Sequence, residues 1–177
     1  MSTLKATNIQ TDNIDPKTSW VTDEIAGNTI KQSDAGKVLQ VVQNVVAAST
    51  MSGAQSDAAT DYFVTITPSS TSSKILVSFT GIIQGHDIIV GWIVKRSIGG
   101  AGYTSTASTE TYTGIADRGG YYNSGNLACQ VLDSPSTTSP VTYKIYITST
   151  SGNVHIGRDL GSTYDADTQC TAMEIAG

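Results

Sequence analysis

Residues 141–148 read Val141-Thr142-Tyr143-Lys144-Ile145-Tyr146-Ile147-Thr148. Apolar or aromatic side chains at the odd positions alternate with Thr, Lys and Tyr at the even positions, and this period of two predicts a half-buried β-strand. Val141, Tyr143, Ile145 and Ile147 should face a core. The strand follows a turn-rich run at 133–140. After a second turn at 151–153 comes a short strand at 154–158, and we expect the two strands to form a hairpin.

Most of the chain repeats this unit of a strand followed by a turn rich in Ser, Thr, Gly and Asp. The same patterning predicts further strands over 37–48, 61–67, 74–80, 86–96, 109–115, 126–132 and 168–175. About eight strands at this spacing predict an all-β, antiparallel jelly roll or β-sandwich.

The composition of the 177-residue chain excludes some classes of partner. The formal net charge is -5 and the pI is about 4.7, which disfavours nucleic acid and anionic membranes. No apolar run reaches the length of a membrane span, and the N-terminus lacks the apolar core of a signal peptide. We therefore expect assembly in a bacterial-type cytoplasm and no membrane insertion.

Residues 1–36 differ from the rest because their apolar side chains stand singly between polar residues, without a regular period. We interpret this segment as an extended arm that docks through Leu4, Ile9, Ile14 and Trp20. The predicted domain organisation is thus an arm over 1–36 and a β domain over 37–177.

Two of the expected strands carry apolar residues on both faces, around Val38–Val46 and Ile88–Val94. A strand of a two-layer sandwich has one face in water, so apolar and polar side chains should alternate along it. Either the arm covers the second face of these strands, or that face lies at an interface between subunits. For the interface we select Val42, Ile89 and Ile93.

Cys129 and Cys170 are the only cysteines, and their spacing matches no metal-binding motif. Each lies in a strand-like run, so we expect two buried free thiols. A disulfide between neighbouring strands is the alternative.

We find no constellation typical of an enzyme, and we expect no catalytic residue, metal or cofactor. Asp159, Asp165 and Asp167 could in principle bind a cation or, with Glu110, line an acidic cleft that acts on glycans. The segment lacks the glycine and glutamate of a calcium-binding loop, so a solvated acidic turn is the simpler reading.

The region 101–126 is rich in Gly, Ser, Asn and Tyr, a composition found in binding loops. Tyr103, Tyr112, Arg118, Tyr121 and Tyr122 are the candidate residues for binding a glycan or protein. Alternatively, the tyrosines pack at the edge of the core or against another subunit.

Four passages of the chain form a recognisable order. They are Gly36-Lys37-Val38-Leu39-Gln40-Val41-Val42, Thr65-Ile66-Thr67-Pro68-Ser69-Ser70-Thr71-Ser72-Ser73-Lys74-Ile75-Leu76-Val77, Leu132-Asp133-Ser134-Pro135-Ser136-Thr137-Thr138-Ser139-Pro140-Val141-Thr142-Tyr143 and the ending Met173-Glu174-Ile175-Ala176-Gly177. Together they resemble the C-terminal head domains of fibre and virion structural proteins from marine tailed phages, especially cyanophages. The opening residues Met1 to Gln10 also resemble the start of such proteins. These passages are turns and strands rather than chemical motifs.

The resemblance implies a homotrimer with jelly-roll heads of the tumour-necrosis-factor type, attached to other phage virion proteins through the N-terminal arm. The expected function is that of a short tail fibre or tail-associated adhesin in the virion, without catalysis. The alternatives are a capsid decoration or head-fibre protein and, from another class, a glycan-active enzyme or a carbohydrate-binding module.

Overall fold

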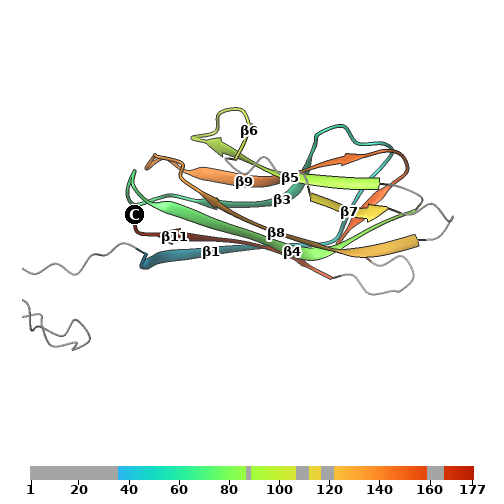
Figure 1. Ribbon diagram of the computed structural model, residues 1–177, viewed down its shortest axis with the longest axis horizontal. Helices are drawn as coiled ribbons and strands as arrows, with labels where there is room; N and C mark the ends of the chain where they lie inside the picture. The colour runs from blue at the N-terminus through green and yellow to red at the C-terminus, as the bar shows by residue number, and fades with distance from the viewer. Residues whose placement is uncertain (1–35, 87–88, 107–111, 117–121, 159–165) are drawn as a thin grey trace, which may run out of the picture. The chain divides into compact units, whose positions relative to one another are not determined.

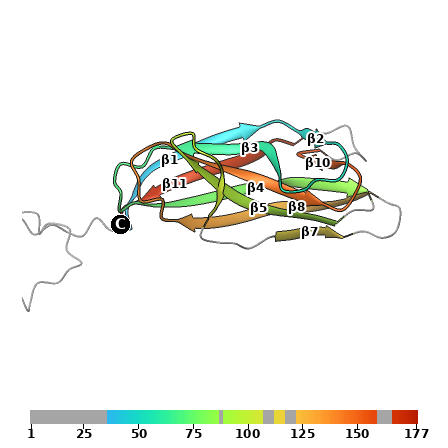
Figure 2. The same ribbon diagram turned by 90° about the horizontal axis from the view of Figure 1, so that it is seen from above.

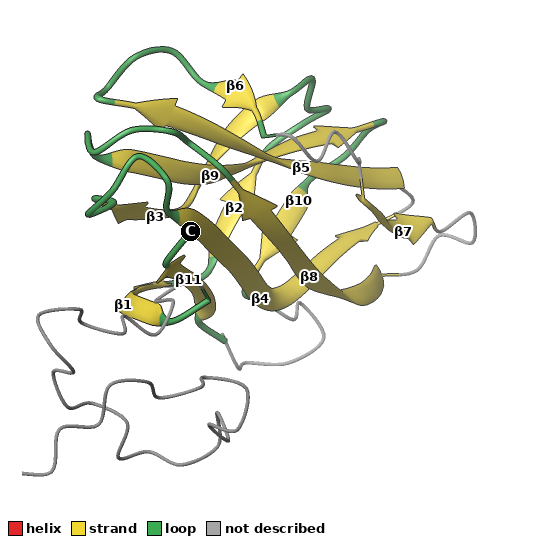
Figure 3. Cartoon of the chain, turned by 60° about the vertical axis from the view of Figure 1, so that its left-hand side comes forward, coloured by secondary structure: helices red, strands yellow, loops and turns green. Residues whose placement is uncertain are grey.

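The computed structural model describes residues 36–86, 89–106, 112–116, 122–158 and 166–177, and the fold is described for these residues alone. They form strands and loops without a helix (Figure 3). The strands are β1 (Val38–Val46), β2 (Ser49–Met51), β3 (Ala58–Ile66), β4 (Lys74–His86), β5 (Ile89–Ile98), β6 (Thr104–Ser105), β7 (Tyr112–Ala116), β8 (Tyr122–Asp133), β9 (Val141–Ser149), β10 (Val154–Ile156) and β11 (Thr168–Ile175).

The strands form two antiparallel sheets that lie one above the other (Figures 1 and 2). One sheet runs β1-β11-β4-β8, with β10 paired to the far half of β4 and β2 paired to β10. The other runs β3-β9-β5, with β6 and β7 beside β5. The short strands β2, β6 and β10 can be left aside, and the other eight strands counted from 1 to 8 along the chain. In that count, β1-β11-β4-β8 reads 1-8-3-6 and β3-β9-β5-β7 reads 2-7-4-5. This is the strand order of a jelly roll, and the expected all-β class is confirmed.

Alternation along the strands determines which side chains lie between the sheets. In β9, Val141, Tyr143, Ile145 and Ile147 are fully buried, as predicted. Tyr62, Val64 and Ile66 of β3 join the same core, as do Ile75, Val77 and Phe79 of β4. Each fully buried aliphatic side chain of this kind contributes about 1.5–3 kcal/mol to the free energy of unfolding.

The hairpin predicted from 141–148 and 154–158 is wrong. β9 pairs with β3 and β5, whereas β10 belongs to the other sheet and pairs with β4 and β2. The chain crosses between the layers at 150–153, because alternation places a strand's side chains but does not choose its neighbours.

The strand predicted over 74–80 extends to His86, and the one predicted over 86–96 begins at Ile89. Gly81 lies within the extended β4 because Thr168 approaches closely there. A Cβ at position 81 would lie 2.6 Å from the hydroxyl oxygen of Thr168. A glycine inside a strand often marks such a close approach.

The two cysteines are buried free thiols, as predicted. Cys129 of β8 and Cys170 of β11 are both cross-strand neighbours of Phe79, so strand β4 lies between them. Strands two places apart lie about 9.5 Å from each other, too far for a disulfide. Burial raises the pKa of both thiols to about 12, which keeps them protonated and unreactive.

A fully buried carboxylate, Glu174 of β11, holds the turn between β3 and β4. Its Oε1 accepts hydrogen bonds from the Ser69 amide at 2.7 Å and from the hydroxyls of Ser69 and Ser73 at 2.6 Å each. Its Oε2 accepts one from Nε2 of Gln40 in β1, also at 2.6 Å. Burial alone raises the pKa of Glu174, but these donors more than offset it and lower the pKa to about 2.

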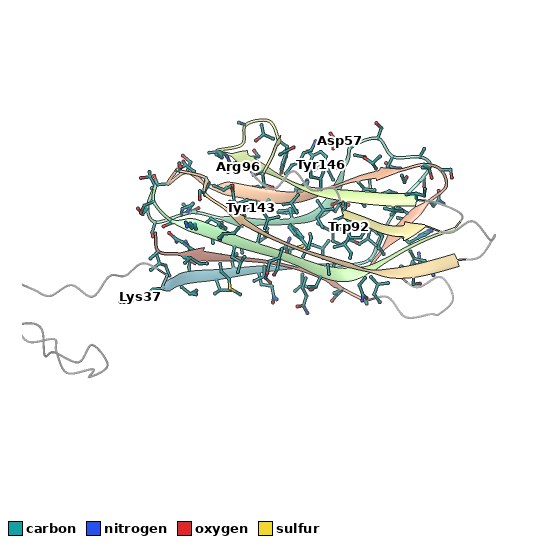
Figure 4. The ribbon with its side chains drawn as sticks, viewed as in Figure 1. Lys37, Asp57, Trp92, Arg96, Tyr143 and Tyr146 are labelled. Atoms are coloured by element: carbon teal, nitrogen blue, oxygen red, sulfur yellow. The ribbon has the colours of Figure 1, made fainter. Side chains whose placement is uncertain are left out.

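A second buried carboxylate, Asp133 of β8, ties the two sheets together. Nη1 of Arg96 in β5 donates to both of its oxygens at 2.5 and 2.6 Å, and the hydroxyl of Tyr143 in β9 donates to Oδ2 at 2.8 Å. In Figure 4, Arg96 and Tyr143 lie near the same end of the sandwich. Burial and the adjacent Asp133 raise the pKa of the Tyr143 phenol, so it stays a donor.

We expect the Glu174 network to make the protein's stability dependent on acid pH. A lowered folded-state pKa gives stability that is present above the unfolded value of about 4.5 and is lost as the pH falls towards 2, in total roughly 3 kcal/mol. Glu174→Gln should lower the free energy of urea unfolding at pH 7 and flatten its pH dependence between 4.5 and 2.

The matched control is Asp61→Asn, which removes an exposed carboxylate from β3. It should leave the shape of the stability curve nearly unchanged. Parallel curves for Glu174→Gln and the wild type would contradict this account of the network.

Candidate functional site

The structure describes only part of the predicted binding region, residues 101–126. Tyr103 precedes β6 and is half-buried on the outer side of the β3-β9-β5 sheet. Tyr112 begins β7 and Tyr122 begins β8, but their side chains are not described. Arg118 and Tyr121 lie outside the described residues.

Tyr103 lies within a cluster that the sequence did not identify. Its ring centroid is 5.5 Å from that of Tyr146 in β9, with the two planes tilted by 53°. The Nζ of Lys144 lies 5.6 Å from the Tyr103 centroid and 5.4 Å from that of Phe63 in β3. The Nζ of Lys95 in β5 lies 4.5 Å from the centroid of Tyr146.

We term these five residues the aromatic–lysine patch: Phe63, Lys95, Tyr103, Lys144 and Tyr146. Backbone register explains how it forms, because Phe63 and Lys95 are the direct cross-strand neighbours of Lys144 on either side. All five side chains are half-buried or exposed, and Phe63 is 38% exposed. Figure 4 shows Tyr146 and Asp57 at the outer side of this sheet.

The two lysines of the patch have different electrostatic surroundings. Lys95 forms an ion pair with Asp57, while its ammonium also lies over Tyr146. Among the described residues no carboxylate pairs with Lys144, whose charge is met by the rings of Phe63 and Tyr103. Burial, and then the adjacent Tyr146, raises the pKa of the Tyr103 phenol, which keeps that hydroxyl able to donate a hydrogen bond.

One signal for the patch was present in the sequence. Lys144 and Tyr146 occupy the outward positions of the strand at 141–148, where alternation predicts exposure. Phe63 and Lys95 could not be added from the sequence, because their adjacency depends on pairing with strands about 50 to 80 residues away.

A second surface of note is apolar and lies on the outer face of the other sheet. Val41 of β1 faces Met173 of β11, which faces Leu76 of β4, which faces Leu132 of β8. Val41 is 57% exposed and Leu132 is 52% exposed. We term these four residues the apolar row. Val38, Leu39 and Val45 of β1 are also exposed on this sheet.

The three residues selected for an interface do not form one surface. Val42 lies on the inner side of β1, partly buried against the core, and its place in an interface stays a prediction. Ile89 and Ile93 lie on the outer side of the sheet that carries the aromatic–lysine patch. The exposed residues Leu39, Val41 and Val45 occupy the outward positions of β1, because inner and outer positions alternate along a strand.

The remaining sequence candidates fall largely outside the described residues. This applies to Glu110, Asp159 and Asp165, and also to Leu4, Ile9, Ile14 and Trp20 in the predicted arm of residues 1–36. Asp167 is described and exposed. Within the described ranges, no group of three or more His, Cys, Asp or Glu side chains could hold a metal ion. No helix formed by those residues is long and apolar enough to cross a membrane.

Comparison with known proteins gives no family assignment: no family model and no curated protein matches the chain. Among solved structures, the Gx strain of infectious bursal disease virus matches with a TM-score of 0.28 and 14% identity over 94% of this chain and 42% of that one. The Gt strain matches with a TM-score of 0.24 and 15% identity over 96% and 41%.

A mutant VP2 protein of the same virus, in derived T=1 particles, matches with a TM-score of 0.23 and 15% identity over 95% of this chain and 41% of that one. The chain spans about two fifths of the length of these viral chains. Similarity at this level carries no argument about function. The class defined by the structure itself is an antiparallel β-sandwich with jelly-roll strand order.

Proposed function

We propose that the protein is a virion structural protein of a tailed phage, acting as a short tail fibre or tail-associated adhesin. Residues 37–177 form a homotrimeric head that projects towards the host surface, and residues 1–36 attach it to other virion proteins. Its role is structural and adhesive rather than catalytic.

The observation that carries the proposal is the apolar row, which no other described residue covers, on a sandwich with jelly-roll strand order. The passages that resemble phage fibre heads include parts of β1, β4, β9 and β11. Three of these strands, β1, β4 and β11, belong to the sheet that carries the row. An antiparallel sheet that faced only water would place polar residues at those positions. The neighbouring row of Gln43, Thr171, Ser78 and Gln130 does so.

The apolar row favours a second copy of the chain as its partner. Exposed apolar patches that cross several strands mark surfaces for protein association. Copies that contact each other through different surfaces close into a ring when the rotation permits, as a trimer requires. The resemblance to trimeric heads supports this arrangement over an unrelated partner.

We expect Val41→Lys to break the trimer. Val41 is exposed in the single chain, so a lysine should be tolerated there, but within an interface it would place an unpaired charge in an apolar environment. Light scattering coupled to size-exclusion chromatography should give three times the 18.5 kDa of one chain for the wild type and one chain mass for the variant.

Thr65→Lys is the matched control, since Thr65 is exposed on the outer face of β3 in the opposite sheet. It should retain the trimer mass. A wild type that is monomeric, or a Val41→Lys protein that stays trimeric, would refute the interface.

Immunogold labelling of intact phage particles with antibody against residues 37–177 tests the virion assignment. Label at the tail is expected, because an adhesin must meet the host surface. Label spread over the capsid would overturn the tail position and indicate a decoration or head-fibre protein. Particles without label would contradict the virion assignment.

A further inference from the structure

We propose that the aromatic–lysine patch is a binding site for an acidic saccharide, with Lys144 pairing the carboxylate of a uronic acid unit and Phe63 and Tyr103 contacting the sugar ring. The inference deepens the adhesive function proposed above and rests on it for the host surface as the source of the saccharide. It assigns binding to residues on β3, β5 and β9 and before β6, rather than to the wider region 101–126.

The first reason is an arrangement of charge that works against folding. Lys95 and Lys144 face each other directly on neighbouring strands, and like charges at such positions destabilise a sheet. Asp57 neutralises Lys95, but no described carboxylate neutralises Lys144. Residues that break a local rule of folding tend to lie at functional sites, and an anionic ligand would supply the opposite charge that the rings of Phe63 and Tyr103 do not carry.

The second reason is the group of aromatic rings around that charge. Phe63 and Tyr103 lie at similar distances on the two sides of the Lys144 ammonium, and Tyr146 extends the aromatic surface beyond Tyr103. Aromatic rings provide large contact areas at low cost in conformational entropy, and the tyrosine hydroxyls can exchange hydrogen bonds with a polar ligand. A sugar ring has both an apolar C–H face and hydroxyl groups, so it complements this surface.

The third reason concerns which anion fits. Nucleic acid requires an extended basic groove that follows the backbone, whereas this patch has two lysines on a chain of net charge -5. A free phosphate would use Lys144 but not the three rings. A carboxylate carried by a sugar ring uses both parts of the patch.

The patch also lies on the sheet opposite the apolar row, so a contact made on the row does not cover the patch of the same copy. The row belongs to β1, β11, β4 and β8, and the patch belongs to β3, β9, β5 and the segment before β6. One copy can therefore use one face for assembly and the other for recognition.

The test is isothermal titration calorimetry with the full chain and oligogalacturonate. Lys144→Met keeps the apolar stem of the side chain and removes its charge, and it should weaken binding by about tenfold or more, the loss of one charge-assisted contact. The matched control Lys74→Met removes a lysine from the opposite sheet, where it is exposed, and should change the affinity by less than about twofold.

Maltooligosaccharide of the same length and inorganic tripolyphosphate separate the two components of the ligand. Both should bind at least about tenfold more weakly than oligogalacturonate, since the first lacks the charge and the second lacks the ring. Thermal melting of both lysine variants establishes that they are folded. Tyr103→Leu, which removes one of the two rings beside the Lys144 ammonium, should also weaken oligogalacturonate binding.

Three results would overturn the inference: no binding of oligogalacturonate by the wild type, equal losses in Lys144→Met and Lys74→Met, or tripolyphosphate binding as tight as that of the saccharide. The immunogold experiment on phage particles does not depend on this site. Tail label without saccharide binding would refute the site alone, and saccharide binding without any label would refute the virion assignment alone.

Discussion

The jelly roll depends at one end on two buried carboxylates that must find hydrogen-bond donors. Glu174 and Asp133 flank Ile75 in a single cross-strand row, and both are almost inaccessible to solvent. A buried charge without partners costs several kcal/mol, so the donors around each carboxylate are required. Glu174 therefore fixes the turn at 68–73 and β1, while Asp133 joins the sheets through Arg96 and Tyr143.

These two networks give a physical meaning to the passages that resemble phage fibre heads. Glu174 belongs to the ending of the chain, and its donors Ser69 and Ser73 belong to the serine-rich turn. Asp133 and Tyr143 come from the beginning and end of a third passage. Passages without catalytic chemistry thus contain the polar contacts that close this end of the sandwich.

The two outer faces of the sandwich differ in chemistry, and this difference organises the proposed function. One face presents Val, Leu and Met side chains across four strands, which suits association between copies. The other presents two lysines among three aromatic rings, which suits a polar, anionic ligand. Because opposite sheets carry them, the apolar row and the aromatic–lysine patch share no residue.

The sequence by itself determined the all-β class, the inward residues of β3, β4 and β9, and the burial of both cysteines, because a strand's side chains alternate with a fixed period of two. Only the tertiary structure decided which strands are neighbours. Pairing joins backbone groups that are chemically alike at every position, so the sequence suggested a hairpin of β9 with β10, which lie in different sheets. The aromatic–lysine patch and the apolar row arise from that choice, since each combines residues far apart in the chain that come together only when non-local strands pair.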